Sequence, residues 1–152
     1  MDAIRVAHVL PDLAIGGAET ALVRLLESLD RTRFASLVVT LRDGGPLVAR
    51  AEHAGARVVR LDMRTRVPSP HTVVRLRAAL RAFAPDVVQG WMYHGNLAAW
   101  LGARLLAAEP ALAWNVRQSL ACLAHQRWAT RLVIRANGKT IHGGIVEPRQ
   151  IH

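Results

Sequence analysis

The chain has 152 residues, is 51% hydrophobic and carries a formal net charge of +9. Its length fits one domain with a buried core, and its hydrophobic content excludes wholesale disorder. The charge rests on arginine, because Lys139 is the only lysine. That balance favours anionic partners, or it reflects arginine serving as a general solubilising residue spread along the chain. The single cysteine, Cys122, excludes an internal disulfide and fits a reducing cytoplasm.

Apolar, β-rich segments alternate with amphipathic segments along most of the chain. The strands that we expect cover residues 4–10, 34–41, 57–61, 87–90 and 112–116. The expected helices cover residues 18–29, 46–54, 71–83, 97–107 and about 120–136. Continuous apolar runs, such as residues 37–39, are typical of parallel strands covered on both faces. An alternating β-α order with right-handed crossovers then predicts a Rossmann-like, doubly wound parallel sheet.

We assign this α/β sheet to a single domain over residues 1–136. The tail, residues 137–152, has no clear periodicity, and two interpretations of it stay open. It forms a further strand-like piece at 144–146, or it is an aberrant end produced by truncation or a shifted reading frame. The uncharged run at 87–103 contains several polar residues and three glycines, so we predict no membrane span there.

The first strand-to-helix turn carries a glycine pair, Gly16-Gly17, followed by Glu19. Glycines let a charged ligand approach the backbone closely, and a helix start offers N–H groups and a positive dipole end. Doubly wound folds usually place nucleotides at this turn. These residues therefore predict a diphosphate site, with Glu19 favoured by the helix dipole. An ordinary flexible turn with Glu19 as a helix-start residue explains the same residues.

Polar segments also follow the fourth and fifth expected strands. Residues 91–96 are expected as a loop at the same edge of the sheet, which places His94 and Asn96 near the glycine turn. His94 can exchange a proton with an acceptor hydroxyl or bind it. Alternatively, His94 bonds the local backbone and Asn96 caps a helix. After the fifth strand, Arg117 can pair with a phosphate through its planar fork, or it is a surface charge.

Several familiar site patterns are absent from the sequence. The dinucleotide fingerprint Gly-x-Gly-x-x-Gly is missing, which argues against a dehydrogenase. The histidines have no second ligand at zinc-binding spacing and Cys122 has no cysteine partner, so no metal site is predicted. Glu19 and Glu27 lie on the same side of one helix, an arrangement that solvent exposure explains.

In their order and spacing, four segments resemble the amino-terminal domain of family 4 glycosyltransferases with the GT-B fold. They are the first strand with Gly16-Gly17-Ala18-Glu19, then Pro85-Asp86-Val87-Val88, residues 91–96, and residues 114–119. The resemblance implies a retaining, metal-independent transfer of a sugar from a nucleotide-sugar donor, which is a substrate and not a cofactor. It further implies that Gly16 and Gly17 face the donor diphosphate, while His94 and Arg117 line the acceptor side. Many relatives carry a histidine near the end of the fifth strand, where this sequence has Arg117.

The second domain of these enzymes supplies most donor contacts and a glutamate pair, and this sequence does not contain it. We therefore expect little or no transferase activity from the chain by itself. The expected acceptor is a sugar or a lipid-linked molecule. The expected location is cytoplasmic, and the charge is compatible with peripheral contact to an anionic inner membrane surface.

Two other classes of function are compatible with a basic α/β domain to different degrees. The alternative is a non-catalytic module that binds a phosphorylated or lipid-linked ligand. A nucleic-acid-binding domain is disfavoured, because the sequence has no compact arginine stripe with interleaved aromatic residues.

Overall fold

The computed structural model describes residues 2–63 and 69–115, which belong to one compact unit. Within them, parallel strands form a five-stranded sheet in the order β3-β2-β1-β4-β5. The strands are β1 (Ile4–Leu10), β2 (Phe34–Thr40), β3 (Arg57–Arg60), β4 (Val87–Trp91) and β5 (Ala111–Asn115). The helices of the same residues are α1 (Gly17–Ser28), α2 (Val48–His53), α3 (Pro70–Phe83) and α4 (Met92–Arg104).

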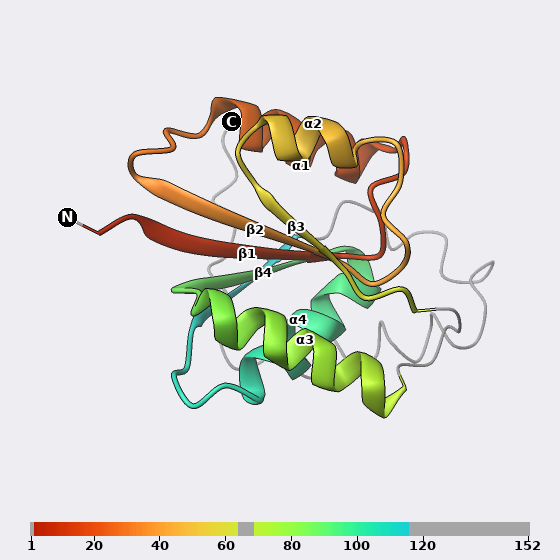
Figure 1. The fold of residues 1–152 in the computed structure, drawn as a ribbon, viewed down its shortest axis with the longest axis vertical. Coiled ribbons are helices and arrows are strands. Elements are labelled where there is room, and N and C mark those ends of the chain that lie inside the picture. The colour runs from red at the N-terminus through yellow and green to blue at the C-terminus, as the bar shows by residue number, and fades with distance from the viewer. Residues whose placement is uncertain (1, 64–68, 116–152) are drawn as a thin grey trace, which may run out of the picture. The chain divides into compact units, whose positions relative to one another are not determined.

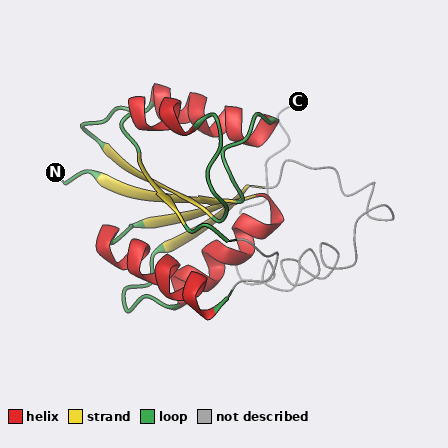
Figure 2. Cartoon of the chain, turned by 45° about the vertical axis from the view of Figure 1, so that its right-hand side comes forward, coloured by secondary structure: helices red, strands yellow, loops and turns green. Residues whose placement is uncertain are grey.

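The helices cover both faces of the sheet. Figure 1 shows α1 and α2 on one face and α3 and α4 on the other, and the turned view in Figure 2 shows the same layers. Strands that alternate with helices, all parallel, require crossovers of this kind. The predicted Rossmann-like, doubly wound sheet is therefore confirmed.

Each face of the sheet has its own apolar core, because successive strand residues point to opposite faces. On the side of α1 and α2, Leu10 and Val38 pack with Leu22 and Leu26 of α1. On the side of α3 and α4, the alternate strand residues pack with the buried stripe of α3. These residues are Val9, Val39, Val88, Leu76 and Leu80. The continuous apolar strand sequences thus reflect two buried faces.

Local sequence explains where the helices begin. Ser69 accepts a hydrogen bond from the Thr72 amide at 3.2 Å, and Pro70 follows at the first helical position, so α3 has a strong start signal. The N-cap residues of α1 and α2, Gly16 and Leu47, make no side-chain hydrogen bond to their helices. Helix α2 begins at Val48, so Pro46 precedes that helix instead of opening it.

One element boundary differs substantially from its prediction. The fourth helix was expected from residue 97, but α4 begins at Met92, directly after β4. The expected helix at 120–136 and the tail at 137–152 lie outside the described residues.

Candidate functional site

Two neighbouring strands, β1 and β4, are followed by helices on opposite faces of the sheet. Strand β1 pairs with β2 on one side and with β4 on the other, while α1 and α4 lie on opposite faces of the sheet (Figure 1). In doubly wound folds, ligands bind outside the carboxyl ends of the strands at such a switch point. The glycine turn after β1 and the first turn of α4 after β4 flank this point.

The glycine turn forms the start of α1. Gly16, at the N-cap, is extended with φ −154° and ψ 173°, a conformation that any residue adopts. A Cβ on Gly16 would lie 2.4 Å from Glu19 Oε2, so the Glu19 side chain would have to shift to accommodate it. A Cβ on Gly17 would meet no atom within 4 Å. Among the described residues, neither a left-handed backbone nor close packing therefore accounts for Gly17, and the space beside it is open.

Glu19 lies against this turn. Glu19 is only 9% exposed, and its carboxylate lies against Gly16. It belongs to the first turn of α1, where the helix dipole favours a negative charge. Solvent exposure therefore does not explain Glu19, contrary to the sequence interpretation. Glu27 differs, because its half-exposed side chain accepts a hydrogen bond from Arg50 Nη2 of α2 at 2.8 Å.

The expected loop at residues 91–96 is wrong. Trp91 ends β4 as the N-cap of α4, and Met92 follows in the helix with a left-handed φ of 61°. Gly95 shows why no loop intervenes: a Cβ there would lie 2.4 Å from the Val9 carbonyl oxygen. The first turn of α4 is thus packed directly on the end of β1.

His94 and Asn96 lie on this first part of α4 and differ in burial. His94 is half-buried, whereas Asn96 is 0% exposed. Asn96 packs on Gly90, where a Cβ would lie 2.6 Å from Asn96 Oδ1. Neither Oδ1 nor Nδ2 of Asn96 has a hydrogen-bond partner in the part of the chain that the structure describes. Asn96 is therefore an interior helix residue, and the alternative of Asn96 as the N-cap is wrong.

A buried histidine, His8, was missed in the sequence. It is 1% exposed on β1, with Nδ1 3.0 Å from Gln89 Oε1 and 3.3 Å from Trp91 Nε1. Burial lowers the pKa of His8 to about 4, although the hydrogen bond to Gln89 acts in the opposite direction. The side chain is therefore neutral near pH 7. A histidine inside an otherwise apolar strand was the signal that could have revealed it.

One family model matches this chain. The model of the glycosyl transferase 4-like domain matches residues 16–143, more than four fifths of the sequence. The chain belongs to this glycosyltransferase family. The match begins at Gly16 and spans α1 to β5, so both regions that flank the switch point lie within it. A comparison with curated proteins found no match.

In this glycosyl transferase 4-like domain, Arg117 lies outside the described residues. The last described residue is Asn115, which ends β5 beside Trp91 of β4. The structure therefore brings Gly16, Gly17, Glu19 and His94 to one edge of the sheet, while the position of Arg117 stays a prediction.

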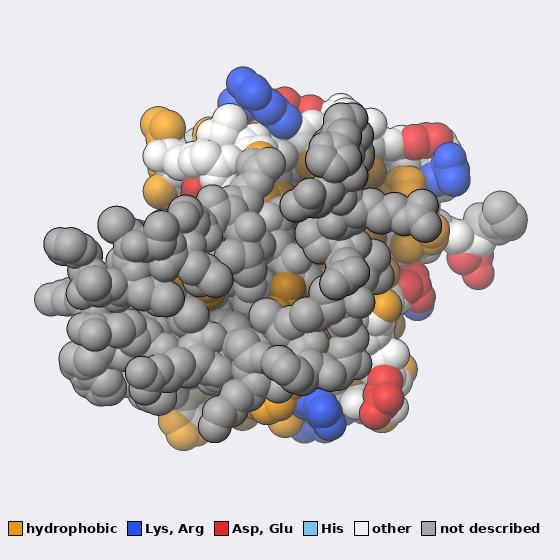
Figure 3. All heavy atoms as spheres, turned by 180° about the vertical axis from the view of Figure 1, so that it is seen from behind, with side chains coloured by type: hydrophobic (Ala, Val, Ile, Leu, Met, Phe, Trp, Pro, Cys, Tyr) orange, Lys and Arg blue, Asp and Glu red, His pale blue; other side chains and the backbone are white. Residues whose placement is uncertain are grey.

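The charges of the domain are dispersed. On the face drawn in Figure 3, the arginine side chains lie in separate groups. Ion pairs join four of the arginines to carboxylates: Arg5 to Asp86, Arg42 to Asp12, Arg50 to Glu27 and Arg75 to Asp62. Within residues 2–63 and 69–115, no cluster of histidine, cysteine and acidic side chains could hold a metal ion. No helix among these residues is long and apolar enough to span a membrane.

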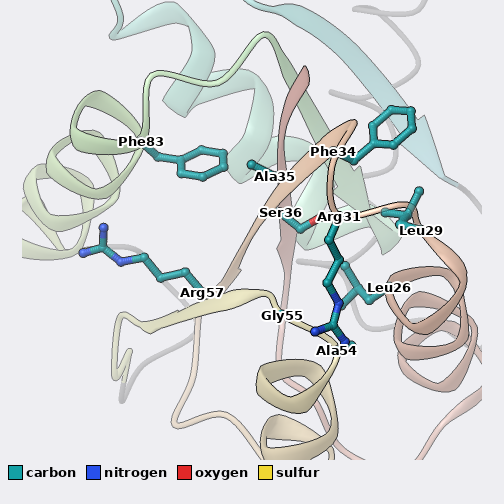
Figure 4. Close-up of a pocket in the computed structure, with 10 residues that line it drawn as sticks. All are labelled: Leu26, Leu29, Arg31, Phe34, Ala35, Ser36, Ala54, Gly55, Arg57 and Phe83. Atoms are coloured by element: carbon teal, nitrogen blue, oxygen red, sulfur yellow. The ribbon is translucent and has the colours of Figure 1, made fainter. Parts of the chain in front are cut away.

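A pocket of about 280 Å³ opens at the opposite edge of the sheet. Figure 4 shows its lining, which comes from the starts of β2 and β3 and the ends of α1 and α3. Arg31 and Arg57 are its charged residues, beside apolar side chains such as Leu26 and Phe83. The pocket contains none of the predicted site residues, and it lies away from the carboxyl ends where such folds bind ligands.

Proposed function

We propose that this domain forms one wall of the cleft in which a retaining glycosyltransferase moves a sugar from a nucleotide-sugar to an acceptor. The observation that carries the proposal is the glycine turn at the switch point. Among the described residues, Gly17 has open space where a side chain would stand, at the first position of a helix whose N-cap is a glycine. Such a helix start favours the negative charge of a diphosphate.

The roles of the residues follow from their places. Gly16 and Gly17 face the donor diphosphate, and Glu19 supports the turn by packing on Gly16. His94, on the first turn of α4, lies on the acceptor side and binds an acceptor hydroxyl or exchanges its proton. Arg117 joins it there and pairs with an anionic group of a sugar or lipid-linked acceptor. The formal net charge of +9 also suits an acceptor presented at an anionic membrane.

These residues hold only one side of a donor site. A diphosphate bound to a helix start alone has few neutralising partners, so a second domain must supply most donor contacts. We therefore propose that residues 1–152 bind the diphosphate weakly and transfer sugar slowly or not at all by themselves. Robust turnover by this chain alone, measured with nucleotide-sugar and acceptor, contradicts this part of the proposal.

A binding titration tests the diphosphate site directly. Uridine and guanosine diphosphates are added to the chain while amide chemical shifts are followed by NMR, and the largest shifts are expected from Gly16 to Thr20. Gly17→Ala places a methyl group in the open space, so it is expected to weaken binding about tenfold, or ~1.4 kcal/mol. Ser28→Ala, at the far end of α1, is the control and is expected to leave binding unchanged.

The outcome separates this function from its alternative. Shifts at Gly16–Gly17 that need the diphosphate and respond to Gly17→Ala support a donor site. Absence of any response at millimolar nucleoside diphosphate overturns it. Binding of a phosphorylated lipid or sugar in place of the nucleotides identifies the domain as a non-catalytic binding module.

A further inference from the structure

The loop that carries the glycine turn is joined to the loop after β2. The Leu13 amide donates to the Gly44 carbonyl at 2.6 Å, and the Leu47 amide donates to the Leu13 carbonyl at 3.1 Å. Leu13 is itself 0% exposed and packs in the core with Leu10 and Leu47. The two loops therefore form one hydrogen-bonded layer at the carboxyl edge of the sheet.

Gly45 permits this close contact between the loops. Its φ is +135°, and a Cβ would lie 2.6 Å from the carbonyl carbon and oxygen of Leu13. A residue with a side chain there would both strain the backbone and push the Leu13 peptide away. The packing of the second loop thus depends on a glycine, although that loop carries no predicted ligand contact.

A charged pair crosses the same two loops. Arg42 Nη2 contacts Asp12 Oδ2, and the Arg42 amide donates to the Pro11 carbonyl at 2.9 Å. The other carboxylate oxygen, Asp12 Oδ1, accepts a hydrogen bond from the Ala14 amide at 3.1 Å. The Asp12 side chain is 12% exposed, whereas that of Arg42 is 59% exposed. One carboxylate thus joins the second loop to the segment that leads into Gly16.

We propose that Asp12 and Arg42 are positioning residues that hold the glycine turn in its anion-binding arrangement without contacting the anion. This inference rests on the proposed function, since it assigns the turn to phosphate. When the pair is broken, the ordered arrangement becomes a fraction of the population, and the apparent affinity falls by that fraction. The contacts of the pair are confined to these two loops, so its loss is expected to appear first as local opening of the loops.

A direct electrostatic effect and a positioning role predict opposite results for Asp12, so substituting this residue distinguishes the two. Removing a negative charge near an anion site strengthens anion binding if the charge acts only through its field. Removing the positive charge of Arg42 weakens binding on either account. A positioning role therefore requires that Asp12→Asn also weakens binding, against the direction of its charge.

The first experiment measures affinity for inorganic pyrophosphate in a double-mutant cycle. We expect Asp12→Asn and Arg42→Met each to weaken binding about tenfold, and the double variant to lose no more than either alone. Glu27→Gln and Arg50→Met break an exposed ion pair between α1 and α2 and serve as controls without effect on binding. Weaker binding by Arg42→Met together with unchanged or tighter binding by Asp12→Asn overturns the proposal, because Arg42 then acts on the anion directly.

The second experiment needs no ligand. Hydrogen exchange of the Leu13 and Leu47 amides reports the two bonds between the loops, and both are expected to exchange about tenfold faster in Asp12→Asn and Arg42→Met. The Val9 and Val39 amides, inside the sheet, are expected to keep their protection. Faster exchange in a protein that binds no pyrophosphate supports the coupling of the two loops by Asp12 and Arg42 but contradicts the proposed diphosphate site. Unchanged exchange at Leu13 and Leu47 overturns the positioning role whatever the protein binds.

Discussion

The glycine turn and the first turn of α4 follow neighbouring strands and both contain glycine, yet their glycines serve different ends. A Cβ on Gly17 would stand in open space, whereas one on Gly95 would lie 2.4 Å from a carbonyl oxygen of β1. The turn leaves room for a ligand, and the start of α4 is filled by the protein itself. Glycine in a strand-to-helix junction therefore indicates either a ligand or close packing, and only three-dimensional contacts tell the two apart.

The largest effect is expected from His8 on β1, the strand that leads into the glycine turn, because its Nδ1 lies 3.3 Å from Trp91 Nε1 at the end of β4. Its pKa is lowered to about 4 in the folded protein, against about 6.5 for an unfolded chain. As the pH falls from about 6.5 to about 4, the unfolded state takes up a proton that the folded state excludes, so stability falls across this window. The loss of unfolding free energy is about 3 kcal/mol in total and is complete below pH ~4.

Urea unfolding at a series of pH values measures this loss. His8→Gln removes the titrating group, so its unfolding free energy is expected to lose that part of the pH dependence. His71→Gln changes an exposed histidine on α3 and controls for the substitution itself. Equal pH dependence in the wild type and His8→Gln contradicts a buried neutral imidazole.

A smaller effect is expected from a matched pair of glycine substitutions. Gly95→Ala is expected to gain about 1 kcal/mol of helix propensity. The same substitution forces a methyl group onto the backbone of β1, and this overpacking is expected to cost about 3 kcal/mol. The net destabilisation is about 2 kcal/mol. Gly17 is the first residue of α1, outside the helix interior where alanine is favoured over glycine, and its added methyl meets no described atom. The unfolding free energy of Gly17→Ala is therefore expected to stay within about 0.5 kcal/mol of the wild type. Equal losses in both variants remove the distinction between the two regions.

The smallest effect concerns the backbone of Met92. Because its φ is 61° at the start of α4, glycine is expected to be tolerated better than alanine there. The unfolding free energy of Met92→Gly is therefore expected to exceed that of Met92→Ala by about 1 kcal/mol. Alanine normally exceeds glycine in a helix by about the same amount, so the order of the two variants is the readout. The usual order would show that the left-handed conformation costs nothing here.

The layers of the fold could be predicted because they depend on patterns repeated over many residues. Strand β1 was predicted with the bounds that the structure has, and β2 and β3 extend one residue less than predicted. Buried parallel strands are apolar on both faces, and α1 and α3 have regular apolar stripes, so period and length distinguish them. The family resemblance inferred from ordered segments was likewise confirmed.

The contacts of the site could not be predicted, because they join residues distant in sequence. Polar residues in 91–96 suggested a loop, yet Gly95 meets Val9 some eighty residues earlier and the helix begins at once. The pairing of Asp12 with Arg42 likewise depends on β1 and β2 lying in register. Sequence patterns report local periodicity, and they do not report which side chains meet across a sheet.

The direct junction between β4 and α4 limits how the chain can be changed at this edge of the sheet. Because Trp91 ends the strand and Met92 begins the helix, no connecting segment is available there to lengthen, shorten or exchange. An inserted residue would rotate every following side chain of α4 by about 100° and lift Gly95 from β1. In the proposed acceptor site, a new acceptor would therefore be accommodated by replacing single side chains, with His94 the half-buried position nearest the junction after Met92.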